Sequence, residues 1–125
     1  MPSEPITPEK LLPLSEPVFY ILLVLTGGDR HGYAIMQEVQ TLTEGRVRLG
    51  PGTLYGAIKR MLIQDLIQEV GDSDDEGERR RYYRLTPFGG EVARAEARRL
   101  EEMVAVARHR QLLEKVTSTD GGAIA

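Results

Sequence analysis

The most informative stretch of this chain is PGTLYGAIKRML, residues 51–62. Its apolar residues at positions 54, 58, 61 and 62 recur at helical spacing, which predicts a helix with one buried face. The other faces carry Thr53, Tyr55, Lys59 and Arg60. A helix with one apolar side and one cationic side is typical of a surface that binds an anionic partner.

The segment after this helix has the pattern of a β-hairpin. Residues 67–70 and 81–85 are rich in β-branched or aromatic side chains, which favour strands. The intervening residues 71–78, GDSDDEGE, are polar and contain glycine, so we expect an exposed loop. A helix followed directly by a hairpin predicts a winged helix.

The residues before position 51 predict two more helices. Ser15 has the character of an N-cap, and the apolar segment after it ends at Gly27 and Gly28. This first helix is apolar on nearly every face, so we expect it at the centre of the core. A second, amphipathic helix is expected from about residue 31 to 42. Four prolines in residues 1–13 predict a flexible arm instead of a helix.

The C-terminal part predicts one long helix that needs a partner. Thr86 and Pro87 are suited to the N-cap and first helical position, and the helix should reach about residue 114. Only the first helix remains to cover its apolar stripe, so we expect a homodimer, with Glu96, Arg98, Arg99, Glu101 and Glu102 in solvent. The predicted dimer interface comprises Val92, Ala93, Ala97, Leu100, Met103, Val104 and Ala107.

The predicted organisation is therefore mainly α-helical with a small β-hairpin: an arm (1–13), a winged helix-turn-helix domain (14–86), a dimerisation helix (87–115) and a disordered tail (116–125). The chain has 125 residues, no cysteine and two histidines. This composition excludes disulfides and cysteine-ligated zinc, and no cofactor or metal is expected. The longest apolar run, residues 18–25, is too short to cross a membrane, so we expect a soluble, cytoplasmic protein.

The distribution of charge matters more than its total. The net charge of −3 argues against a uniformly basic nucleic-acid binder. Residues 46–60, however, contain four basic side chains and no acid, and residues 79–84 again contain four. An acidic block at residues 72–78 separates them. Basic patches of this kind provide an electrostatic footprint for phosphate.

Three segments together resemble the PadR-like transcriptional regulators. They are HGYAI at 31–35, GTLYGAIKRM at 52–61 followed by LI at 66–67, and RYYRLTPFG at 81–89. The resemblance covers roughly residues 14–113. It implies a winged helix-turn-helix domain, a C-terminal dimerisation helix of the smaller size class, and repression or control of a nearby promoter. The chain departs from the family in its wing, where an acidic loop replaces a basic, proline-containing stretch.

On this reading, residues 51–62 form a recognition helix for the major groove of double-stranded DNA. Arg60 is the base reader favoured by chemistry, although its late position in the helix also suits a phosphate contact. His31 and Tyr33 could bind phosphate at a helix N-terminus or simply cap and pack, and one of Tyr82 and Tyr83 must face the domain. The predicted DNA-binding residues are Arg46, Arg48, Thr53, Tyr55, Gly56, Lys59, Arg60, Arg79, Arg80 and Arg81.

The predicted function is regulation of transcription by a homodimer, acting as a repressor on a palindromic operator. The alternative is a winged helix that binds another protein without catalysis. An enzyme is not expected, because no nucleophile motif, phosphate-binding loop or paired carboxylates are present. A small-molecule effector is a further candidate partner, and the place to look is near Phe19, Leu23, Met103 and Val106, for which ordinary core packing is the alternative interpretation.

Overall fold

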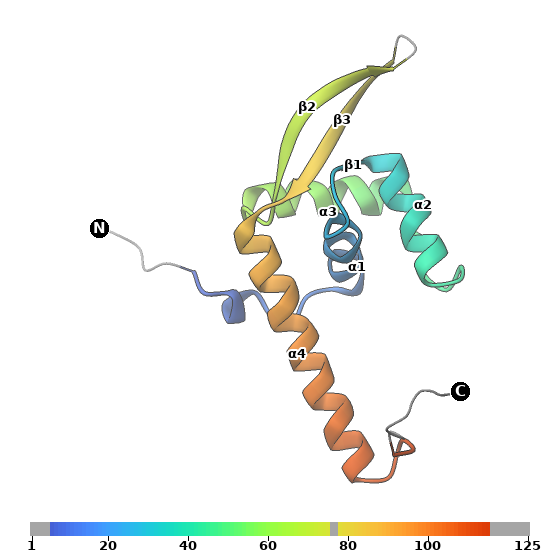
Figure 1. Ribbon diagram of the computed structural model, residues 1–125, viewed down its shortest axis with the longest axis vertical. Coiled ribbons are helices and arrows are strands. Elements are labelled where there is room, and N and C mark those ends of the chain that lie inside the picture. The colour runs from blue at the N-terminus through green and yellow to red at the C-terminus, as the bar shows by residue number, and fades with distance from the viewer. Residues whose placement is uncertain (1–5, 76–77, 116–125) are drawn as a thin grey trace.

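The protein folds into a small helical domain from which a β-hairpin and one long helix project (Figure 1). The computed structural model describes residues 6–75 and 78–115, and the side chains of these residues outside positions 72–80. Within these ranges the elements are η1 (Pro8–Leu11), α1 (Glu16–Leu25), β1 (Arg30–His31), α2 (Gly32–Leu42), α3 (Pro51–Ile63), β2 (Ile67–Asp75), β3 (Glu78–Leu85) and α4 (Pro87–His109). The prediction of a winged helix-turn-helix with a long C-terminal helix is confirmed.

The helix starts follow from capping residues in the sequence. The hydroxyl of Ser15 accepts a hydrogen bond from the amide of Val18, at 3.4 Å, and the hydroxyl of Thr86 accepts one from the amide of Gly89, at 2.9 Å. Proline in the first turn of α1, α3 and α4 has no amide hydrogen that would need a partner there. The predicted starts of α1 and α4 are therefore confirmed.

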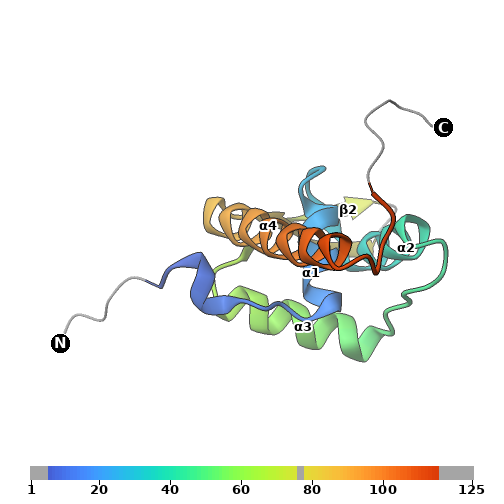
Figure 2. The same cartoon turned by 90° about the horizontal axis from the view of Figure 1, so that it is seen from below.

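The core is built around α1, as its sequence predicts. Ile21 and Leu22 of α1 are fully buried, together with Leu54 and Met61 of α3 and Val92 of α4. The side chains of α2 and β3 contribute to the same cluster. In Figures 1 and 2, α1 lies between α3 and α4. The packing of α3 and the direction of α4 therefore both depend on α1.

The sheet has three antiparallel strands in the order β1-β3-β2. The hairpin strands extend beyond the predicted segments, because residues 72–75 of β2 pair with residues 78–81 of β3. The prediction of a long loop was wrong here, because the strands are held by backbone pairing, which needs no apolar alternation in the sequence. A bulge lies between Glu69 and Asp72. The two-residue β1, which pairs Arg30 with Tyr83, was not predicted.

The predicted arm is anchored to the domain over part of its length. Residues 8–11 form the 3-10 helix η1, which packs beside α4, and Leu11, Leu12 and Leu14 pack against the core. Residues 1–5 and the predicted tail, 116–125, lie outside the described residues.

Helix α4 has two halves with different surroundings. Val92 and Ala93 are buried in the core of their own subunit, so they cannot also form the predicted dimer interface. Glu96 is buried too, although it was expected in solvent. Beyond it, Met103 and Val104 are exposed, and the helix ends at His109, earlier than predicted.

Candidate nucleic-acid interface

Helix α3 separates its side chains as the sequence pattern predicts. Leu54, Ala57, Ile58 and Met61 are buried against the domain. Thr53, Tyr55, Lys59 and Arg60 are exposed, and Gly56 is half-buried. The apolar side therefore fixes the helix in the core and leaves the cationic side facing outward.

Lys59 and Arg60 are available to an outside anion. Among the residues that the structure describes, no carboxylate lies within ion-pair distance of either side chain. Arg60 lies beside the backbone of Gly56, where an added Cβ would be 3.7 Å from a guanidinium nitrogen. A small residue at position 56 thus leaves room for the arginine along the outer face.

Tyr55 has a packing role that its predicted DNA contact did not include. Its side chain is 48% exposed, but its ring lies against Gly32 at the start of α2. A Cβ at position 32 would lie 2.3 Å from the phenol oxygen, so only glycine fits below this ring. Tyr55 therefore fixes the first turn of α2 against α3 and keeps an exposed edge.

Arg46 and Arg48 lie in the turn between α2 and α3. Arg46 is exposed and forms a 3.6 Å ion pair with Glu44, and Nε of Arg48 donates to the carbonyl of Gly45 at 3.4 Å. Exposed pairs of this kind are weak, and a phosphate can compete for both arginines. They precede the N-terminal end of α3 in the chain, and their role as phosphate contacts stays a prediction.

In the described part of the wing, arginines lie beside or opposite acidic residues. Arg81 is exposed and lies 3.6 Å from Glu69 across the hairpin. The backbone register places Asp72 opposite Arg81 and Asp74 opposite Arg79. The predicted contacts of Arg79 and Arg80 involve side chains outside the described residues. Of the three arginines predicted to contact DNA from the wing, Arg81 is the one whose side chain lies within the described residues.

The two tyrosines of the wing face different ways. Tyr83 is 5% exposed, and burial raises the pKa of its phenol above the ordinary value of 10.0, with Glu69 and Tyr55 acting in the same direction. Tyr82 packs edge-on against the ring of His31, with centroids 5.4 Å apart. Nδ1 of His31 accepts from the amide of Ala34 at 3.1 Å and caps α2. Of the two readings of His31, local capping is the one that the structure supports.

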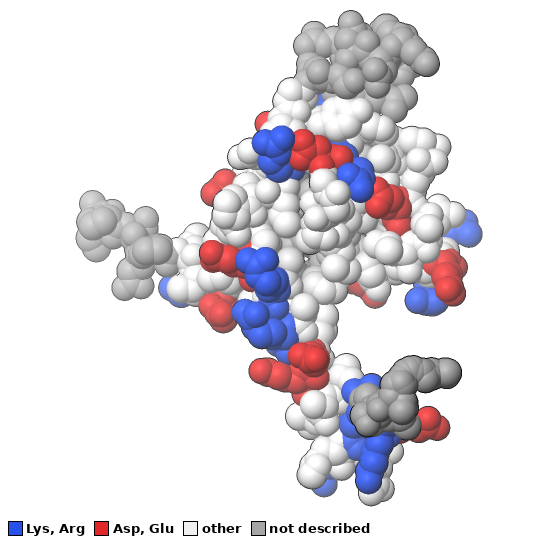
Figure 3. Space-filling model, in the orientation of Figure 1, with Lys and Arg blue, Asp and Glu red and all other residues white. Residues whose placement is uncertain are grey.

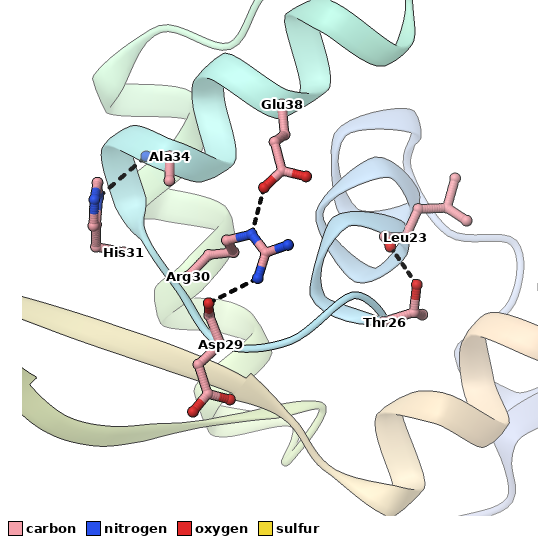
Figure 4. A network of polar contacts seen from close by, with 7 residues as sticks. All are labelled: Leu23, Thr26, Asp29, Arg30, His31, Ala34 and Glu38. Atoms are coloured by element: carbon pink, nitrogen blue, oxygen red, sulfur yellow. Dashed lines mark hydrogen bonds and ion pairs between the residues drawn. The ribbon is translucent and has the colours of Figure 1, made fainter.

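A polar network missed by the sequence reasoning joins β1 and the loop before it to α2 and to the wing, and Figure 4 shows its part around Arg30. Arg30 forms an ion pair with Glu38 of α2 and donates to the carbonyl of Asp29 at 2.9 Å. Two nitrogens of Arg84, on β3, donate to the carboxylate of Asp29 at 3.0 and 2.9 Å. The Arg84 hydrogen bonds lower the pKa of Asp29 below its ordinary value of 3.8. These contacts link residues far apart in sequence and leave no local signal.

Basic and acidic side chains alternate over the face shown in Figure 3 instead of forming one basic surface. Helix α3 runs along the opposite side of the molecule, behind α1 in the view of Figure 1. The unpaired cations of α3 thus lie apart from the mixed charges on this face.

Comparison with known proteins identifies the family. The sequence model described as "Transcriptional regulator PadR-like family" matches residues 21–95, more than half of the chain. The chain belongs to the PadR-like family of transcriptional regulators. The match spans the second half of α1, then α2, α3, the wing and the first part of α4, and it contains the motifs that carried the resemblance.

Solved structures agree with this assignment. The chain is similar to a PadR family transcription regulator from Clostridium difficile, with 26% identity, a TM-score of 0.67, and coverage of 78% of this chain and 99% of that one. It is also similar to a transcriptional regulator from Clostridium thermocellum, with 25% identity, a TM-score of 0.66, and coverage of 77% and 96%. These neighbours support a winged-helix transcription regulator that binds DNA.

A curated relative extends beyond the region of similarity. A 37.1 kDa protein in a transposon of Streptomyces fradiae is 38% identical over 77 residues. The match covers 62% of this chain but only 21% of that protein. The similarity is therefore limited to about a fifth of the relative's length.

The PadR-like regulator also carries a groove between α1, α4 and β3, with a volume of about 480 Å³. Phe19 and Leu23 line it, as the sequence reasoning predicted for an effector site, together with Ala93 and Ala97. Arg84 and Asp29 stand at its edge, and Arg94 also lines it. Met103 and Val106, which were predicted to line the same space, are instead exposed further along α4.

Other classes of site find no support in the described ranges. No group of three potential metal ligands occurs there. In the same part of the chain, none of the helices combines the length and the apolar character that spanning a membrane requires.

Proposed function

We propose that this PadR-like regulator acts as a homodimer that binds a palindromic operator in double-stranded DNA and represses transcription. The observation that carries this proposal is the outer face of α3, where Lys59 and Arg60 are exposed without an acidic partner among the described residues. A helix of this kind fits the major groove, which is wide enough to admit it.

The outer half of α4 supports the homodimer. Met103, Val104 and Val106 are 56%, 38% and 63% exposed on a helix that extends away from the domain (Figure 1). Apolar side chains gathered along one projecting helix are normally covered by another chain. The proposed dimer face therefore consists of Ala97, Leu100, Met103, Val104 and Ala107, without Val92 and Ala93.

A two-fold dimer places two α3 helices on one side of the DNA. Half-sites one helical turn apart, about 34–36 Å, would let both helices enter successive major grooves. The operator should then be an inverted repeat. An effector that occupied the groove between α1 and α4 would control binding only if it fitted one dimer arrangement better than another.

Selection of DNA ligands from a random duplex library tests this function. We expect the full chain to enrich an inverted repeat, and the affinity for that duplex to fall steeply as the salt concentration rises. Competitor DNA of unrelated sequence should not displace the protein at equal concentration. If no sequence is enriched and salt has no effect, the proposal is wrong, and the alternative of a protein-binding winged helix is favoured.

A further inference from the structure

Glu96 stands at the point where α4 leaves the winged domain. Its side chain is 2% exposed, and it is the last buried residue of α4 in the described structure. It lies on the same face of the helix as Val92 and Leu100, one turn before and one turn after. A carboxylate thus occupies a core position that an apolar side chain could fill.

The contacts of Glu96 join both ends of the domain. Oε2 accepts a hydrogen bond from the backbone amide of Leu14, at 3.0 Å, across 82 positions of sequence. Arg99 donates from Nε to Oε1 at 2.6 Å and from Nη2 to Oε2 at 3.0 Å. One side chain therefore ties the entry to α1 to the exit of α4.

The chemistry of this contact indicates a role in geometry. The Glu96 carboxylate is buried and loses its hydration, whereas Arg99 is 33% exposed, so the pair is not expected to stabilise the fold more than apolar side chains of similar size would. Hydrogen bonds, in contrast to apolar contacts, hold two elements at a defined distance and direction. The Arg99 hydrogen bond lowers the pKa of Glu96 below its ordinary value of 4.5, so the carboxylate is ionised at neutral pH.

We propose that Glu96 is a positioning residue that fixes the angle between the winged domain and α4, and thereby sets the spacing of the two half-sites that the dimer accepts. This inference rests on the proposed function. Glu96 does not touch DNA in this account; it acts through the direction of α4.

The length of α4 makes a small angle important. From Glu96 to His109 the helix extends about 20 Å, at about 1.5 Å per residue. A rotation of about 10° at Glu96 moves the far end by about 3.5 Å, close to the rise of one base pair. Loosening this joint should therefore let the dimer accept half-sites that differ by a base pair.

The first test measures the dimer without DNA. Because the chain has no cysteine, Ile63→Cys provides one spin-label site per subunit, at a position that is 76% exposed at the end of α3. Pulsed electron paramagnetic resonance then gives the distance between the two spin labels, and so between the ends of the two α3 helices. We expect a narrow distribution in the Ile63→Cys protein and a distribution at least about twice as broad after Glu96→Ala. Glu96→Gln keeps an acceptor for Leu14 but loses the charge, and should broaden it less.

The second test measures operator spacing by selection from random duplexes. The unmodified chain should strongly prefer one spacing, and Glu96→Ala should reduce that preference by about tenfold, the effect of one charge-assisted hydrogen bond, while the half-site sequence stays unchanged. Glu102→Gln, an exposed carboxylate on the same helix, is the charge control. Ile67→Val, a conservative change in the buried core on β2, controls for lost stability.

The outcomes distinguish failure of this inference from failure of the proposed function. If the unmodified chain enriches an inverted repeat but Glu96→Ala keeps both the narrow distances and the single spacing, this inference is overturned and the proposed function stands. If the unmodified chain enriches no sequence, the proposed function is overturned and this inference with it. If Ile67→Val broadens the spacing as much as Glu96→Ala, the effect is one of stability and the inference is also overturned.

Discussion

Arg60 and Lys59 are neighbours on α3 with different chemistry. The planar guanidinium of Arg60 can pair with two acceptors on guanine, whereas the ammonium of Lys59 acts as a compact charge. We expect Arg60→Ala to relax the preference at one base pair by about 1–3 kcal/mol, and Lys59→Ala to weaken all sequences alike. Binding titrations with the selected duplex and its single-base variants measure this. Uniform weakening by Arg60→Ala would place that arginine on phosphate.

Glu96 should make stability depend on pH. Its pKa is lowered in the folded protein, so its contribution to stability is present above the unfolded value of about 4.5 and is lost as the pH falls through the folded value. We expect the free-energy difference between the unmodified chain and Glu96→Gln to shrink below pH ~4.5. Thermal melts from neutral to acid pH measure it. A difference that is constant with pH would contradict the ion pair with Arg99.

At the residue scale, the sequence predicted the outer side chains of α3 better than the polar residues of the core. The stripe that contains Val92 and Leu100 also contains Glu96, so periodicity offered a signal for its burial. The charge of Glu96 outweighed that signal, because charged residues are rarely buried without a partner. Its partner amide at Leu14 is 82 positions away, and nothing local in the sequence marks it.

Thr86 joins three elements at the base of the wing. Its hydroxyl donates to the carbonyl of Asp65 at 2.7 Å and accepts from the amide of Gly89 at 2.9 Å. Thr86→Val keeps the shape of the side chain but removes the cap of α4 and leaves buried groups unpaired, so we expect a loss of about 2 kcal/mol in the free energy of unfolding.

Urea denaturation measures this loss, and Thr26→Val is the matched control. Thr26 makes the same kind of hydroxyl-to-carbonyl bond, to Leu23 at 2.6 Å, but at an exposed helix end. Thr26→Val should change the free energy of unfolding by no more than about 0.5 kcal/mol. Equal losses in the two variants would show that Thr86 has no special role at the junction.

At the element scale, sequence patterns predicted helices well and the sheet only in part. Helix starts carry local chemistry, such as Ser15 and Thr86, and amphipathic helices carry a period. The outer hairpin has neither, because its strands are held by backbone pairing that no side-chain pattern marks. The strand β1 has two residues and forms only because β3 lies beside it.

At the scale of the whole molecule, the exposed stripe of α4 predicts association. Val104 is 38% exposed and lies on the proposed dimer face. We expect Val104→Glu to convert a dimer into a monomer at micromolar concentration, because two charges would have to be buried in the interface. Sedimentation velocity measures the change. Ala105→Glu, exposed one position further on the helix, should leave the dimer intact; a monomeric unmodified chain would contradict the proposal.

The charge of the molecule shows what sequence totals miss. A net charge of −3 hides the separation between α3, whose cations have no acidic partner in the described structure, and a face where arginines such as Arg84 pair with acids such as Asp29. The spacing of residues along the chain predicted the cationic face of α3. The pairing of Arg84 with Asp29 depends on the packing of β3 beside the end of α1, which the sequence does not reveal.

The most direct test of the account compares two double variants on the selected duplex by fluorescence anisotropy. Lys59→Ala with Arg60→Ala removes the cations of α3, and Arg98→Ala with Lys115→Ala removes one arginine and one lysine from exposed positions in and after α4. We predict that the first pair weakens binding by about 30-fold or more, equivalent to about 2 kcal/mol, and the second by less than about threefold. Equal weakening by the two pairs would contradict the claim that α3 is the DNA-binding surface.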